Sequence, residues 1–118
     1  MTIYKERRAF SDIDTAVHHI VDVPPCCPRS GNPLAGSKLW VSYRPRGVVF
    51  PVEALADMVA EYVGGHGAVR EMEGMVQHIA SRVSEIVGVR VRCRANLIIR
   101  PPFGGENQKM IVTAIGQP

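Results

Sequence analysis

The sequence predicts an α+β domain in which two strands, two helices and two further strands follow one another. Apolar residues alternate with polar ones near both ends of the chain and recur at helical spacing in its middle, with proline or glycine between these segments. This order predicts a four-stranded antiparallel sheet with both helices on one face. A chain of 118 residues suits a single domain, in which we expect residues 1–11 to form a loosely packed N-terminal arm.

The first two strands are expected over residues 16–23 and 38–44. The first ends at Pro24-Pro25, because proline has no N–H to donate to a neighbouring strand. The second shows strict alternation and is followed by a turn at Pro45 to Gly47. On the first strand, His18 and His19 are expected to face opposite sides of the sheet.

The two helices are expected over residues 52–62 and 72–86. Pro51 suits the first turn of the first helix, and Gly64-Gly65 suits its end. The second helix has the clearer apolar stripe and closes at Gly88.

The last two strands are expected over residues 89–97 and 110–115, joined by a turn at 101–107. A sheet of four strands leaves two open edges, which pair readily with another chain unless they are covered. We therefore expect a ring-shaped homo-oligomer with active sites between subunits.

Composition excludes several classes of protein. No apolar run is long enough to span a bilayer, so no membrane partner is expected. Three cysteines without a Cys-x-x-Cys spacing predict reduced thiols in a cytoplasmic protein and no metal site. A net charge of +3 permits a polyanionic partner without requiring one.

Cys27 is the leading candidate for catalysis. It lies in the segment Val23–Pro33, which contains four prolines, and each proline restricts the backbone around it. Such a loop presents a thiol in a fixed position, as a nucleophile requires. The ordinary alternative is that Cys26 and Cys27 are small apolar residues in a turn.

The motif Cys27-Pro28-x-Ser30-Gly31-x-Pro33, together with Met72-Glu73 at the start of the second helix, resembles the 7-cyano-7-deazaguanine nitrile reductases of the tunnelling fold. The resemblance implies that Cys27 attacks the nitrile carbon to form a thioimide and that Glu73 binds the edge of the purine-like ring. It makes Ser30 a candidate substrate-binding residue. It also implies a ring-based assembly, such as a decamer.

These roles also agree with the chemistry of the residues. A positioned thiolate can activate a weak electrophile such as a nitrile, and a carboxylate can accept two hydrogen bonds from paired N–H donors. The alternative for Glu73 is an acid that, like Glu71, complements the dipole of the helix. His66 could exchange a proton near neutral pH and is a further catalytic candidate.

The chain departs from the reductase pattern at three places. Leu34 stands where the family has an aspartate, and Met72 stands where it has a histidine. The entry to the first helix, residues 50–57, contains no lysine to bind a nicotinamide cofactor phosphate, so NADPH is not expected.

The missing lysines and the small size of the chain resemble more closely the archaeosine synthase branch of the same family, in which ammonia attacks the thioimide to give a formamidine. That branch acts on a base already in nucleic acid, and Arg90, Arg92 and Arg94 could contact its phosphates. The alternative for these three arginines is that they lie on a solvated strand face and pair with acidic residues. Whether the base is free, in tRNA or in DNA stays open.

Three other functions remain open. The first is reduction of the nitrile by NADPH. The second is an activity like that of GTP cyclohydrolase, with Cys26 or Cys27 and a histidine holding a metal. The third is a base-binding subunit without catalysis.

Overall fold

The α+β class is confirmed by the computed structural model, which describes residues 4–118. The elements follow in the order β1 (Arg7–Arg8), β2 (Val17–Asp22), β3 (Lys38–Tyr43), β4 (Val48–Val49), α1 (Leu55–Ala60), α2 (Met72–Val87), β5 (Val91–Ile99) and β6 (Gln108–Gly116).

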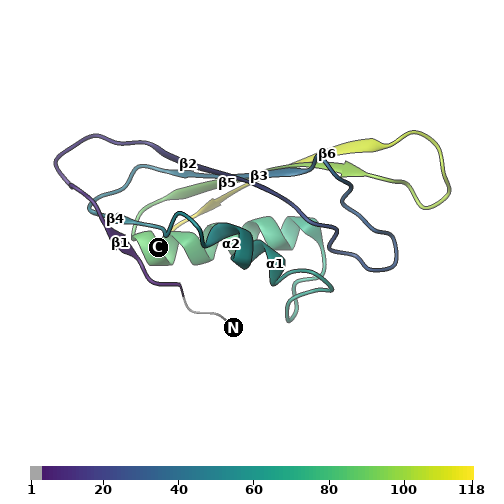
Figure 1. The fold of residues 1–118 in the computed structure, drawn as a ribbon, viewed down its shortest axis with the longest axis horizontal. Coiled ribbons are helices and arrows are strands. Elements are labelled where there is room, and N and C mark those ends of the chain that lie inside the picture. The colour runs from purple at the N-terminus through teal and green to yellow at the C-terminus, as the bar shows by residue number, and fades with distance from the viewer. Residues whose placement is uncertain (1–3) are drawn as a thin grey trace.

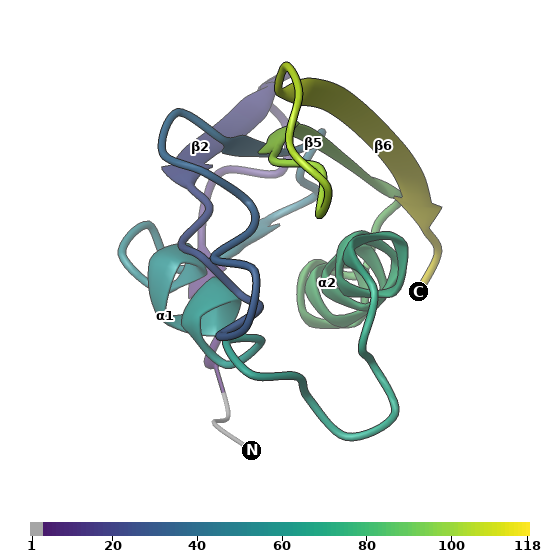
Figure 2. The same cartoon turned by 90° about the vertical axis from the view of Figure 1, so that its right-hand side faces the viewer.

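The main sheet has four antiparallel strands in the order β2-β3-β5-β6. The central strands β3 and β5 pair directly with each other, and the chain between them contains both helices. The two helices lie on the same face of the sheet (Figures 1 and 2). The other face carries no helix. The predicted antiparallel sheet with both helices on one face is therefore confirmed.

Alternation along the strands decides which side chains enter the core. In β3, Leu39, Val41 and Tyr43 are buried, while the residues between them are half-buried on the open face. Their partners on β5 are the buried Ala95, Cys93 and Val91. His19 is buried and His18 is exposed, as the alternation predicts.

The core lies between the sheet and the helices. It is one cluster to which β3, β5, α1 and α2 contribute most of the buried side chains. Its largest fully buried members are Leu39, Leu55, Met58, Met75, Ile79 and Leu97.

Helix α2 agrees closely with its expected range and ends at Gly88, whose φ of 73° is the left-handed conformation that a glycine favours. Helix α1 is shorter than expected, because residues 51–54 form a turn and Val52 is 80% exposed. The spacing of Val52 matched the helical stripe, but its side chain packs against no core.

Strand β6 approaches α2 unusually closely at Gly116. A Cβ atom at this position would lie 2.1 Å from the carbonyl oxygen of Ala80. Only a residue without a side chain fits there, so Gly116 fixes the distance between the sheet and the helix.

The N-terminal segment contacts the rest of the chain through backbone pairing and through side chains. Strand β1 pairs with β4, which the sequence did not predict, and the Tyr4 hydroxyl donates to Glu61 at 2.6 Å. Most side chains of residues 5–16 are nevertheless exposed, and residues 1–3 of the expected arm lie outside the described residues.

Within residues 4–118, no helix is long and apolar enough to cross a membrane.

Candidate active site around Cys27

Backbone hydrogen bonds close the loop that holds Cys27. The N–H groups of Cys26 and Cys27 both donate to the carbonyl oxygen of Asn32, at 2.8 and 3.0 Å, and the Gly31 N–H donates to the Cys27 carbonyl at 2.8 Å. The Asn32 side chain binds both backbone groups of Arg100, just past the end of β5. The cysteine loop, residues 23–33, is thus attached to the end of a central strand.

The three thiols differ in exposure. Cys26 is buried and donates to the carbonyl oxygen of Pro24 at 3.2 Å, and burial raises its pKa. Burial also raises the pKa of Cys93, to about 12. Cys27 is exposed.

The surroundings of Cys27 favour its thiolate. Hydrogen bonding from the Ser30 side chain lowers the pKa of Cys27, with further contributions from the backbone of Ser30 and Arg29. A reactive cysteine needs both access and a lowered pKa. Among the three thiols, Cys27 alone combines them.

Cys27 borders a hollow of about 290 Å³ between its loop and the start of α2. Tyr62, Met72 and Met75 give the hollow apolar walls, and its polar lining includes Arg70 and Glu71. An apolar hollow with a few polar groups is typical of a small-molecule site.

Glu71, not Glu73, lines this hollow. Glu71 is the N-cap of α2, and its side chain makes no capping hydrogen bond. Glu73 lies in the first turn of α2 and is exposed. Within one chain the acidic residue that lines the hollow beside Cys27 is therefore Glu71, whereas the resemblance to the nitrile reductases implies Glu73.

Leu34 offers no proton to the site. Its backbone N–H donates to the carbonyl oxygen of Ile98 at 2.8 Å, and its side chain is half-buried. Glu71 is the one carboxylate among the residues that line the hollow.

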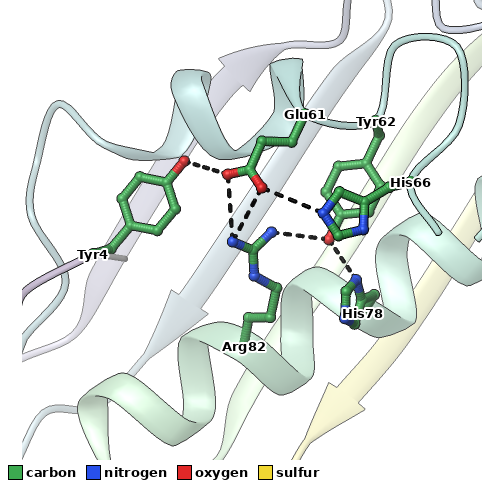
Figure 3. Close-up of polar contacts among 6 residues, drawn as sticks. All are labelled: Tyr4, Glu61, Tyr62, His66, His78 and Arg82. Carbon is green, nitrogen blue, oxygen red and sulfur yellow. Dashed lines mark hydrogen bonds and ion pairs between the residues drawn. The ribbon is translucent and has the colours of Figure 1, made fainter. Parts of the chain in front are cut away.

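His66 belongs to a polar cluster next to the hollow rather than to its lining (Figure 3). The cluster is centred on Glu61, which accepts from Tyr4 at 2.6 Å, pairs with Arg82 at 3.3 Å and lies 3.4 Å from Nε2 of His66. Burial raises the pKa of Glu61, but hydrogen bonds from Tyr4 and Arg82 outweigh it, so the net pKa is lowered.

Tyr62 joins this cluster to the hollow. Its ring lines the hollow, while its hydroxyl lies 2.7 Å from Nδ1 of His78 and accepts from Arg82 at 3.2 Å (Figure 3). The ring of His66 packs on Tyr62 with 4.8 Å between centroids. The cluster thus holds one wall of the hollow in place.

No local pattern in the sequence predicts this cluster. Its six members come from four segments of the chain, and the spacing of Tyr62 indicates only an apolar position on the first helix. Contacts between residues so far apart in sequence depend on how the helices pack.

The arginines of the expected phosphate row lie away from Cys27. Arg92 and Arg94 point to the open face of β5, and Arg90 directly precedes that strand. The cysteine loop is attached past its other end, at Arg100. A strand of this length spans about 30 Å, so Arg90 and Cys27 lie at opposite ends of the sheet.

Within the described part of the chain, no group of three or more His, Cys, Asp or Glu side chains is placed to hold a metal ion.

Comparisons with family models, with curated proteins and with solved structures find no match for this chain. The likeness to the nitrile reductases thus depends on the residues of the cysteine loop and of the start of α2.

Proposed function

We propose that this chain is an enzyme that forms a Cys27 thioimide with the nitrile of a 7-cyano-7-deazaguanine base and converts it to a formamidine with ammonia. The observation that supports this most directly is the exposed Cys27 thiol, whose pKa is lowered, at the edge of a hollow whose lining also includes Glu71. The resemblance of the loop to the nitrile reductases supplies the identity of the substrate.

The reaction needs two additions and one departure. The Cys27 thiolate forms a bond to the nitrile carbon, one C–N π bond breaks, and the nitrogen takes up a proton. Ammonia then adds to the same carbon, the C–S bond breaks, and the thiolate leaves. A lowered thiol pKa favours both attack and departure.

Glu71 is placed to bind the base. Glu71 lines the same hollow as Cys27, and a carboxylate can accept two N–H donors from an aminopyrimidinone edge. A role for Glu73 would require that it reach a base held by another subunit, because it does not line the hollow of its own chain.

Reduction by NADPH is the second candidate, and the structure adds nothing in its favour. Glu53 and Asp57 are exposed at the entry to α1, where a cofactor phosphate would have to bind. The cation beside them, Arg7, lies 3.6 Å from Glu53 and is therefore paired already.

A tunnelling-fold ring is part of the same proposal. Strands β2 and β6 are the edges of the main sheet, and pairing between copies would satisfy their outer backbone groups.

Product analysis tests the function. The protein is incubated with the nitrile base, free or within an RNA, and with either an ammonium salt or NADPH. We expect a formamidine with ammonium and no oxidation of NADPH. An aminomethyl product with consumption of NADPH would contradict the proposal and establish the reductase.

A further inference from the structure

The open face of the main sheet combines basic side chains with one tryptophan. Cross-strand pairing places Trp40 beside Ile20 on one side and Arg94 on the other, and the next row joins His18, Ser42 and Arg92. No helix covers this face (Figure 2).

Three adjoining hollows follow one another along this face. The largest, of about 670 Å³, includes Arg46, Arg90 and Arg92 in its lining. The second shares Arg92 with it and adds Trp40 and Arg94, and the third continues from Trp40 to the two lysines of the face, Lys38 and Lys109. We call this series the basic track.

The basic track ends close to the cysteine loop. Its third hollow includes Ile98, whose carbonyl oxygen accepts the N–H of Leu34, the residue that follows the loop. A ligand that occupied the whole track would therefore extend from Arg90 to the end of the sheet that holds Cys27.

Most of the positive charge on the track is not neutralised by the protein. Within residues 4–118, Arg46, Arg90, Arg92 and Arg94 have no ion-pair partner; Lys38 is paired with Asp22, and Arg44 with Asp14. This finding argues against the alternative in which Arg90, Arg92 and Arg94 are paired with acidic residues of the same chain.

We propose that the basic track binds a single-stranded polynucleotide, with phosphates on the arginines and a base stacked on Trp40. Cations spaced around a partly exposed aromatic ring are the arrangement that recognises single strands, because a base can stack only when it is released from a duplex. The inference rests on the proposed function for the identity of the modified base, but not for the binding itself.

Pairing of sheet edges in a ring would not use the residues at the centre of the track. Such pairing uses the backbone of β2 and β6, whereas Trp40, Arg92 and Arg94 lie on the two central strands. The track is thus compatible with the proposed assembly.

Trp40 makes the test direct, because it is the one tryptophan of the chain. The full-length protein is titrated with an oligouridylate of roughly 12 nucleotides, a length within the usual range for single-strand sites. Tryptophan fluorescence reports stacking, and anisotropy of a labelled oligonucleotide reports binding. A duplex of the same length and polyglutamate serve as competitors.

We expect saturable quenching of Trp40 and weak competition by the duplex and by polyglutamate. The double variant Arg92→Ala/Arg94→Ala should bind roughly tenfold or more weakly, with a salt slope lower by about 1 for each lost phosphate contact. Arg7→Ala, which removes an exposed arginine on β1, is the matched control and should bind like the wild type.

Three results would overturn the proposal: no binding, binding without quenching of Trp40, or equal loss in Arg7→Ala and in the double variant. Cys27→Ala separates this inference from the proposed function, since it should abolish thioimide formation and leave quenching unchanged. A loss of quenching in Cys27→Ala would also contradict the proposal, because binding on the basic track should not depend on Cys27.

Discussion

The backbone N–H of Gly64 donates to the carbonyl oxygen of Cys26 at 2.7 Å. This bond joins the link between the two helices to the cysteine loop, and the two segments form opposite sides of the hollow beside Cys27. The position of the thiol relative to Tyr62 and Glu71 is therefore set by the backbone, before any ligand binds.

The lowered pKa of Cys27 predicts a shifted pH profile of alkylation. The thiolate fraction rises as pH passes through the thiol pKa, so Cys27 should react with iodoacetamide at lower pH than an ordinary cysteine. Ser30→Ala removes the side-chain hydrogen bond that lowers the pKa of Cys27 most, and should move the profile to higher pH. Cys26→Ala is the control and should leave the profile unchanged; an unchanged profile in Ser30→Ala would show that Ser30 does not act on the thiol.

The two acids at the start of α2 predict different effects on base binding. Glu71→Gln replaces an acceptor with a donor inside the hollow and should weaken binding by about 1–3 kcal/mol, measured by calorimetry with the Cys27→Ala protein. Glu73→Gln should change it little, because Glu73 does not line the hollow. A larger loss in Glu73→Gln would assign the base to the residue that the family motif indicates.

Gly116 predicts a stability effect that is independent of function. Gly116→Ala would place a Cβ 2.1 Å from the Ala80 carbonyl oxygen, so β6 and α2 must move apart. We expect a loss of about 1–3 kcal/mol in the free energy of unfolding, measured by urea denaturation. Thr113→Ala, at an exposed position of β6, should be nearly neutral; equal stability of the two variants would contradict the close approach.

The open edges of the sheet predict that activity depends on assembly. Light scattering should give a homo-oligomer at assay concentration, and dilution should abolish activity before it changes the circular dichroism spectrum. A fully active monomer would refute the ring.

Local patterns predicted most of the fold. Alternation and helical spacing located β2, β3, α2, β5 and β6 within about two residues of their observed ends, because each has enough residues to show a period. Strands β1 and β4 have two residues each, too few for any pattern.

The site was only partly predictable. Cys27 could be singled out because proline and glycine shape its loop locally. The place of Glu71 and the cluster around Glu61 depend on how the link between the helices folds back on the cysteine loop, which no short pattern encodes. The side chain of His66, a catalytic candidate from the sequence, contacts Glu61 and Tyr62 and does not line the hollow beside Cys27.

Intact-protein mass spectrometry after incubation with 7-cyano-7-deazaguanine, without ammonia, tests the central claim most directly. The account predicts a mass increase equal to one base, mapped to Cys27, present in Cys26→Ala and absent from Cys27→Ala. No adduct on a protein that binds the base, or an adduct that survives in Cys27→Ala, would contradict it.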